Sequence, residues 1–325
     1  MTGLKHPIQY PIEIEGLTKK YRDNMAVDNV NLKVPAGSVF GFLGPNGAGK
    51  TTTIKILTGL ISATSGRAKV FEQAVTTEIS PDLKQSIGYL AQEPVFPPQL
   101  TGTEVMAMVA ETYRLQGKEW HDRANGLLQE FDLLPAANRR VGAYSRGMRQ
   151  RLGIATVLLP APPLMILDEP ASALDPQGRY EVLEMVSRLR GEATVFFSSH
   201  ILADVERVCD WVAIIDRGQI LKQSRLGDLL DEYTGLHPGY FLRLLDRGTE
   251  AAQELTREDW VMVAEVGDDN GVTVRTTAGQ YGLLQEGLVA ALVTRGYTVT
   301  ELRPLKPDLE EIFLALTAKR EGVER

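Results

Sequence analysis

The stretch SVFGFLGPNGAGKTTTIKILT (Ser38–Thr58) decides the fold of this chain. It begins with a short apolar run, Ser38–Leu43, which is typical of a buried strand. A glycine-rich turn follows, and Lys50–Thr58 then carries Ile54 and Leu57 at helical spacing before Gly59. A strand, a glycine-rich loop and a helix in this order predict a phosphate-binding loop in an α/β domain.

The turn itself, Gly44–Thr51, fits the pattern G-x-x-x-x-G-K-[ST]. Its glycines let successive backbone N–H groups point at phosphate oxygens, and the following helix adds its positive N-terminal end. Lys50 supplies a charge for the β- and γ-phosphates, and the Thr51 hydroxyl can ligate Mg²⁺. The alternative, a glycine-rich turn without a ligand, is disfavoured by the flanking strand and helix. The residues expected to contact a nucleotide are Gly44, Pro45, Asn46, Gly47, Ala48, Gly49, Lys50, Thr51 and Thr52.

A second apolar run, Leu164–Leu167, ends in two adjacent carboxylates, Asp168 and Glu169. Two acids at a strand end repel each other unless they have different tasks or face a cation. We expect Asp168 to hold Mg²⁺ through its water shell and Glu169 to polarise the attacking water. A solvated acidic turn is the alternative, and the phosphate loop makes it the weaker one.

A third apolar run, Thr194–Phe197, leads through two serines to His200. A lone histidine is more often structural than catalytic. Residues at the carboxyl ends of strands in α/β sheets tend to face the ligand, however, so His200 is a candidate for a phosphate contact.

Strands that alternate with helices over the first part of the chain predict a largely parallel sheet. After Tyr233 the pattern changes, and Thr234–Gly239 resembles a linker. We therefore expect an ATP-binding domain at 8–233 and a small α+β domain at 240–325. In the first domain, further strands are expected at Ile12–Ile14 and Val30–Val34, and helices at Glu104–Leu115, opened by the capping box Thr101–Glu104, and at Gly178–Arg190. In the second, strands are expected at Tyr240–Leu245, Trp260–Val266, Val272–Thr276 and Tyr297–Leu305, and helices at Leu283–Thr294 and Leu309–Leu316.

Composition narrows the classes of function. The chain has 325 residues and a net charge of −7, which disfavours a nucleic-acid binder. Its uncharged run Gly153–Leu167 is short and broken by prolines, whereas a membrane span needs about 20 apolar residues. Cys209 stands in an apolar context and is expected to be a small core residue.

Taken in order, these elements resemble the nucleotide-binding domain of an ABC transporter, over about Ile8–Asp231. The resemblance implies a P-loop NTPase fold, with a RecA-like core and a helical signature subdomain, that uses ATP and Mg²⁺. It implies that Tyr21 stacks on adenine, that Gln92 touches Mg²⁺, and that His200 contacts the γ-phosphate. Lys50, Glu169 and His200 would be the catalytic residues, and Ser172–Asp175 would form an interface loop.

The segment Tyr144–Gln150 resembles the signature motif of that family, with departures from its usual Leu-Ser-Gly-Gly-Gln. Tyr144, Arg146 and Met148 replace the first, third and fifth residues. Ser145 and Gly147 are retained, and the resemblance implies that they meet the γ-phosphate of ATP bound by a second copy of the chain. Arg146 either reaches a phosphate or is a solvated surface charge.

The family resemblance implies an ATP-hydrolysing exporter subunit that works as a head-to-tail homodimer on a separate transmembrane permease. It would lie at the cytoplasmic face of the membrane, touching the permease through about Glu93–Gln116. Alternatively, Val95, Phe96, Pro97 and Pro98 fold into the chain's own helical subdomain. Other functions considered are a soluble ATPase of this family acting on ribosomes or DNA, and a binding module without catalysis. The cargo stays open. The C-terminal domain resembles an accessory domain of bacterial exporter ATPases, with Pro307–Thr317 as its closing helix and a dimer-stabilising or regulatory role as the hypothesis.

Overall fold

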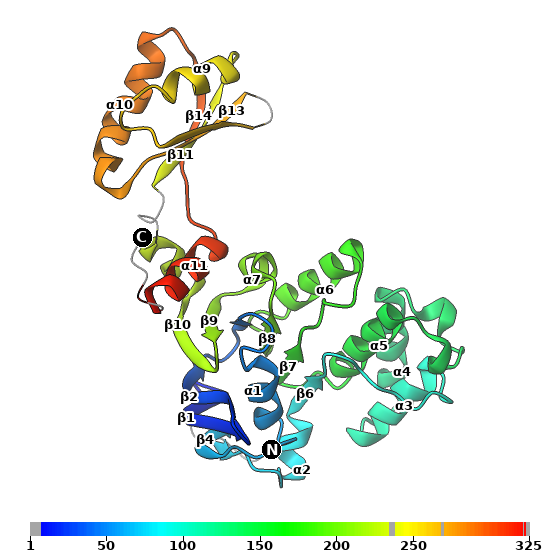
Figure 1. The fold of residues 1–325 in the computed structure, drawn as a ribbon. Helices are drawn as coiled ribbons and strands as arrows, with labels where there is room; N and C mark the ends of the chain where they lie inside the picture. The colour runs from blue at the N-terminus through cyan, green and yellow to red at the C-terminus, as the bar shows by residue number, and fades with distance from the viewer. Residues whose placement is uncertain (1–7, 234–237, 268–269, 321, 323–325) are drawn as a thin grey trace. The chain divides into compact units, whose positions relative to one another are not determined.

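The computed structural model describes residues 8–233, 238–267, 270–320 and 322, and the chain folds as two compact units (Figure 1). Unit 1 ends at Leu226 and unit 2 begins at Gly227. The predicted linker Thr234–Gly239 falls mostly on 234–237, outside the described residues, and Gly239 already begins a strand. Within the described residues, no helix has both the length and the apolar character to cross a membrane.

The centre of unit 1 is a six-stranded sheet in which β3 (Val39–Leu43) lies between β8 and β9. All five residues of β3 are buried, which explains its continuous apolar run. Strands β6, β7, β8, β3 and β9 run parallel, and β10 pairs antiparallel with β9, so the predicted largely parallel sheet is confirmed. In spatial order the strands are β10 (Gln219–Arg225), β9 (Trp211–Asp216), β3, β8 (Thr194–Ser199), β7 (Leu164–Asp168) and β6 (Ile87–Leu90).

The two faces of β3 contact different helices. Phe40 and Phe42 belong to the core that also holds the apolar side chains of α1 (Lys50–Leu57). Gly41 faces α7 (Leu202–Val208), and a Cβ atom there would lie 2.7 Å from a methyl of Val205. Helix α7 therefore packs directly on the strand backbone, a close approach that needs glycine.

A second, antiparallel sheet of unit 1 has the order β2-β1-β4-β5. The predicted strands Ile12–Ile14 and Val30–Val34 are correct in type but too short. Their outer halves are partly exposed and polar, so they lack the apolar alternation that marks a strand, although β1 and β2 stay paired as far as Tyr21 and Asn24. The strands are β2 (Asn24–Val34), β1 (Ile12–Tyr21), β4 (Ser65–Val70) and β5 (Gln73–Ala74).

Helices α3, α4 and α5 contact one another at one end of unit 1 (Figure 1). The predicted capping box is confirmed at the start of α3: Thr101 Oγ1 accepts from the Glu104 amide, and Glu104 Oε2 accepts from the Thr101 amide. The helices of unit 1 are α1, α2 (Pro81–Gln85), α3 (Gly102–Thr112), α4 (Glu119–Glu130), α5 (Arg146–Leu158), α6 (Pro176–Arg188) and α7, with short 3₁₀ turns at Leu134–Ala136 and Val141–Ala143. Helix α8 (Leu226–Glu232) spans the boundary between the units.

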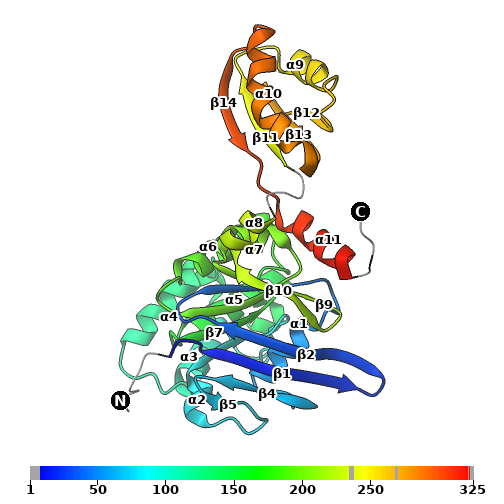
Figure 2. The ribbon, with the colours of Figure 1, turned by 90° about the vertical axis from the view of Figure 1, so that its left-hand side faces the viewer.

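Unit 2 is a βαββαβ fold with the sheet order β12-β13-β11-β14 (Figure 2), the split βαβ arrangement of ferredoxin-like domains. Leu242 and Leu244 alternate along β11 on the face that packs against α9 and α10. This is the predicted small α+β domain, with one helix, α9, that the sequence analysis did not anticipate. The elements are β11 (Gly239–Leu244), α9 (Gly248–Leu255), β12 (Val263–Val266), β13 (Gly271–Arg275), a 3₁₀ turn (Ala278–Gln280), α10 (Tyr281–Thr294), β14 (Val299–Pro304) and α11 (Leu309–Arg320).

Candidate nucleotide site

The loop Gly44–Lys50 joins the carboxyl end of β3 to the start of α1. Gly49 has φ 107°, and a Cβ atom there would lie 2.4 Å from the carbonyl oxygen of Ala26. A Cβ atom on Gly44 would lie 2.2 Å from the carbonyl oxygen of Ile215. Both positions therefore need glycine. No side chain caps α1, so its first-turn N–H groups stay available to an anion.

The loop borders a cavity of about 720 Å³ in unit 1. Ten of the residues predicted to bind nucleotide, bind metal or act in catalysis line it, and Arg146, Ser172 and Arg217 line it as well. The ten are Tyr21, Asn46, Gly47, Gly49, Lys50, Thr51, Thr52, Gln92, Glu169 and His200.

Lys50 is buried at the base of the loop. Its Nζ donates to the carbonyl oxygens of Gly44, at 2.6 Å, and Pro45, at 3.1 Å, and lies 3.5 Å from Glu169 Oε1. Burial lowers the pKa of Lys50, and the neighbouring carboxylates of Glu169 and Asp168 oppose that shift. Two neutral carbonyls and one carboxylate therefore hold the ammonium. Negatively charged phosphate oxygens can replace these partners.

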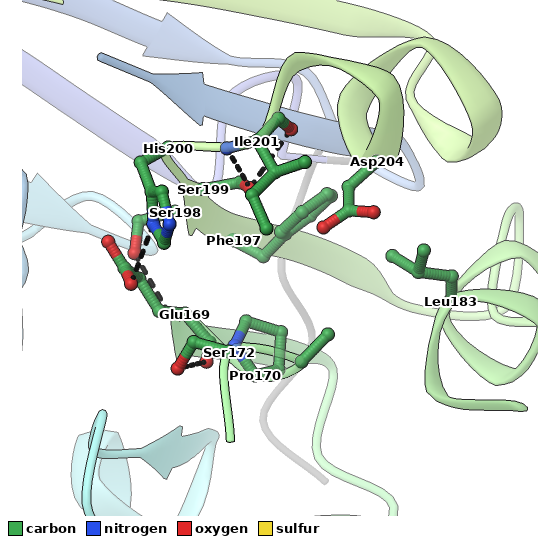
Figure 3. A pocket seen from close by; sticks show the side chains of 11 residues that line it. Glu169, Pro170, Ser172, Leu183, Phe197, Ser198, Ser199, His200, Ile201 and Asp204 are labelled. Carbon is green, nitrogen blue, oxygen red and sulfur yellow. Dashed lines mark hydrogen bonds and ion pairs between the residues drawn. The ribbon is translucent and has the colours of Figure 1, made fainter. Parts of the chain in front are cut away.

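Glu169 is the side chain on which the predicted catalytic groups meet. Its Oε2 lies 3.0 Å from His200 Nδ1 and 3.4 Å from Gln92 Nε2, while its Oε1 faces Lys50. Figure 3 shows the Glu169 and His200 side chains pointing toward one another across the ends of β7 and β8. Glu169 also has a left-handed backbone, with φ 48°, a conformation that non-glycine residues adopt mainly where function or context requires it.

Asp168, the last residue of β7, is almost fully buried. Its Oδ1 accepts from the Ser198 hydroxyl at 2.6 Å, whereas its Oδ2 is buried without a hydrogen-bond partner. Burial raises the pKa of Asp168, and the nearby hydroxyls of Ser198 and Thr51 oppose that shift. A buried carboxylate oxygen without a donor suits a hydrated cation, which would satisfy it.

The remaining predicted contacts lie apart from this cluster. Tyr21, at the end of β1, is 45% exposed, with Lys19 Nζ 5.0 Å from its ring centroid. Ser145 caps α5 by accepting from the Met148 amide at 3.2 Å. Ser145 and Gly147 do not line the cavity of their own chain, whereas Arg146 between them does.

Arg217 was not expected at the cavity from the residues alone, and for Arg146 a phosphate contact was one of two alternatives. Arg217 lies in the turn between β9 and β10, and that turn meets the loop because the Gly218 amide donates to the Ala48 carbonyl at 2.9 Å. No sequence pattern signals this contact, since it joins segments far apart in the chain. The variant signature was a signal for Arg146, but it left two alternatives open.

The predicted partner-facing segment begins beside Gln92. Val95 is 89% exposed, and Phe96 is half-buried. A separate hollow is lined by Pro94, Val95, Phe96, Pro98, Val141, Gly142 and Arg149.

Comparison with known proteins identifies the family of this chain. A family model described as "ABC transporter" matches residues 27–172. The daunorubicin/doxorubicin resistance ATP-binding protein DrrA of Streptomyces peucetius is 35% identical over 94% of this chain and 92% of its own. The bacitracin transport ATP-binding protein BcrA of Bacillus licheniformis is 34% identical over 94% of this chain and 96% of its own.

Solved structures with a similar fold also come from ABC transporters. An ATP-binding subunit of an ABC transporter has a TM-score of 0.64 and 30% identity, covering 68% of this chain and 92% of its own. The bacterial ABC transporter cassette MJ0796, solved as a dimer, has a TM-score of 0.61 and 27% identity, covering 66% of this chain and 98% of its own. The predicted P-loop NTPase fold with an ABC-type nucleotide-binding domain is confirmed.

Proposed function

Because this chain belongs to the ATP-binding proteins of ABC transporters, which bind and hydrolyse ATP, we propose that it powers export through a separate membrane permease. The proposal is supported by relatives of nearly the same length that are named for drug resistance and bacitracin transport. Those names favour a transporter over the alternative of an ATPase acting on ribosomes or DNA. We further propose that the chain contacts the permease through Glu93–Gln116 and lies at the cytoplasmic face of the membrane.

The single observation that carries the proposed chemistry is the convergence of Lys50, Gln92 and His200 on Glu169 beside the loop. When ATP enters, the Lys50 ammonium moves from loop carbonyls to the β- and γ-phosphates. Glu169 then loses one cationic neighbour and is free to accept a proton from the attacking water. His200 moves from Glu169 to the γ-phosphate, where it and the Lys50 ammonium stabilise the charge that develops there.

Thr51, Gln92 and Asp168 would hold Mg²⁺, which neutralises phosphate charge when it is bound. The buried, unpartnered Oδ2 of Asp168 supports this assignment. Asp168 would act through a water shell, as its position at the end of β7 suits.

We assign the adenine contact to Tyr21, which lines the cavity and has an exposed ring. Ser145 and Gly147 would complete the site of a second copy in a head-to-tail dimer, because they do not line the cavity of their own chain. The dimeric state of the related cassette MJ0796 supports two chains acting together. We also propose that the ATP-binding domain spans 8–233 and the accessory domain 240–325.

The substitution Glu169→Gln tests this function. Without its carboxylate the chain should still bind Mg-ATP, and hydrolysis should fall by about 10²–10⁴-fold, as for removal of a general base. The stalled protein should then collect as a closed dimer in size-exclusion chromatography with Mg-ATP. The control is Glu192→Gln, an exposed glutamate after α6. A Glu169→Gln protein that stays monomeric with Mg-ATP would contradict the two-copy site.

A further inference from the structure

The turn between β9 and β10 holds an arginine where the backbone favours other residues. Asp216 pairs with Gln219, so the turn consists of Arg217 and Gly218. Both have left-handed backbones, with φ 46° and 79°. Two-residue hairpin turns with two positive φ angles prefer Asn-Gly or Asp-Gly, because this conformation is costly for most other residues. Local rules of this kind are broken mainly at functional sites, so a function is expected for the Arg217 side chain.

Hydrogen bonds fix this turn against the phosphate loop. The Gly218 amide donates to the Ala48 carbonyl at 2.9 Å, and the Gly218 carbonyl accepts from the Asp28 amide at 2.8 Å. A Cβ atom on Gly218 would lie 3.1 Å from the carbonyl oxygen of Ala26, so β2 approaches the turn closely. The backbone of Arg217 therefore has a fixed place beside the loop that holds the nucleotide.

The Arg217 side chain can reach a ligand from this place. It lines the same cavity as Lys50 and Tyr21, and 67% of it is exposed. Its Nε lies 3.9 Å from Asp216 Oδ2, a long ion pair between neighbouring residues. A pair of this length with an exposed arginine contributes little, so breaking it in favour of a molecule in the cavity has a small cost.

The strand order indicates which part of ATP Arg217 meets. Gln92, Glu169 and His200 follow β6, β7 and β8, which all lie on one side of β3, and they converge where the terminal phosphate is expected. Arg217 follows β9, on the other side of β3, and β10 after it contacts β2. Tyr21, the proposed adenine contact, lies at the end of β1 that pairs with β2. Arg217 therefore lies on the side of the base.

We propose that Arg217 is a ligand of the nucleoside part of ATP, with its guanidinium stacked on the adenine ring. The nucleotide is the one bound by the phosphate loop of the same chain. A planar guanidinium stacks on aromatic faces and is attracted to their electron-rich surface. The proposal rests on the adenine contact assigned to Tyr21 above. ADP carries the same nucleoside, so Arg217 serves both nucleotides, unlike a residue that contacts the terminal phosphate.

Binding of nucleotides with and without the terminal phosphate tests this contact. Arg217→Ala should raise the Kd for ADP and for a non-hydrolysable ATP analogue by the same factor, roughly three- to tenfold, the size of a partly desolvated cation–π contact. Arg217→Lys should bind almost as weakly, because an ammonium keeps the charge without the plane. Isothermal titration calorimetry measures these constants. Unchanged Kd values, a change for the ATP analogue alone, or full recovery with Arg217→Lys would each overturn the proposal.

A third substitution separates the contact from a structural role of the turn. Asparagine is favoured in this turn, so Arg217→Asn should raise the melting temperature without nucleotide by roughly 1–3 °C while it weakens binding of both nucleotides. A residue that only supports the fold would lose stability and affinity together, which would contradict a ligand role. The matched control is Arg247→Asn, at a left-handed arginine of unit 2 with φ 53° outside the cavity. It should leave both Kd values unchanged.

Two further variants distinguish a failure of this proposal from a failure of its premises. Tyr21→Ala should raise the Kd for the same two nucleotides. If it does and the Arg217 variants do not, the contact by Arg217 alone is wrong. If it does not, the adenine end of the cavity is wrongly assigned and the placement of Arg217 fails with it. ATP hydrolysis by the wild-type protein, lost with Lys50→Ala, tests the proposed function independently of both.

Discussion

Unit 1 and unit 2 bury different kinds of side chains. Unit 1 buries Lys50 and Glu169 in the lining of one cavity and also buries Asp168, the residue before Glu169. In the part of the chain that the structure describes, unit 2 contributes one buried polar side chain, Thr276. Its core is otherwise built from aliphatic side chains and the Tyr297 ring, and its charges, such as the Arg295–Glu258 pair, are partly exposed. Buried charge is costly to maintain, so its concentration marks unit 1 as the place of chemistry and unit 2 as a packed accessory.

The largest effect expected from this contrast is the loss of hydrolysis on removing Lys50. Lys50→Ala should lower the ATP hydrolysis rate by about 10²–10³-fold or more, because a preorganised cation at the phosphates is lost. Lys55→Ala, on the exposed side of the same helix, should have no such effect. Arg295→Ala in unit 2 should lower stability and leave hydrolysis intact. Near-normal hydrolysis by Lys50→Ala would remove the loop from the mechanism.

The next effect concerns the stability cost of Asp168. The raised pKa means that the folded state favours the protonated acid, so Asp168 makes stability fall as pH rises from its ordinary pKa through the raised one. In EDTA without nucleotide, Asp168→Asn should remove that part of the decline and add up to about 1–3 kcal/mol to the free energy of unfolding near pH 7. Urea unfolding at a series of pH values measures both the decline of stability with pH and the free energy of unfolding near pH 7.

Mg-ATP should make the wild-type protein more stable than Asp168→Asn, the reverse of their order in EDTA. The wild type should gain thermal stability on addition of Mg-ATP, whereas Asp168→Asn should gain much less because it lacks the cation ligand. An Asp168→Asn protein that is less stable than wild type in EDTA would show that the buried carboxylate is not costly. The contrast between the units would then lose its physical basis.

A smaller effect distinguishes two helix caps within unit 1. Ser145→Ala at α5 and Thr101→Ala at α3 should each lower the free energy of unfolding by about 1 kcal/mol, since both hydroxyls accept a first-turn amide. Ser145→Ala alone should also weaken ATP-dependent dimerisation. Chemical denaturation and size-exclusion chromatography provide the two measurements. Equal dimerisation by the two variants would contradict the shared site.

The smallest effect on turnover is expected from removing 234–325. The rate per dimer should be unchanged because the cavity is lined by unit 1 alone. If the C-terminal domain stabilises the dimer, the truncated protein should need a higher concentration to dimerise. Sedimentation velocity with Mg-ATP at a series of protein concentrations measures the concentration at which the dimer forms. Unchanged dimerisation would count against the dimer-stabilising hypothesis, and a lower rate per dimer would contradict the division of roles.

Local signals were sufficient for much of unit 1. The apolar run at β3, the glycines of the loop and the capping box at Thr101 each depend on neighbours in sequence, and each was predicted near its observed place. The two acids at the end of β7 and His200 after β8 could be expected together, because parallel strands end at one edge of the sheet.

Contacts made by exposed or distant side chains could not be predicted in this way. The Glu93–Arg146 pair joins residues far apart in sequence, and neither side chain interrupts an apolar pattern. The contact of the Gly218 turn with the loop depends on the register of β9 beside β3. In unit 2, α9 was missed because its polar, glycine-started sequence resembles a loop, although Ala251, Ala252 and Leu255 pack into the core.

The place of β3 between β8 and β9 has a consequence for folding during synthesis on the ribosome. The phosphate loop is complete once Thr51 has been made, yet both strands that flank β3 come after residue 190. At about 5–20 residues per second, the apolar β3 waits on the order of ten to thirty seconds for its neighbours. During that time the nascent chain exposes a strand made for burial. Translation speed and chaperone supply should therefore influence the yield of active protein.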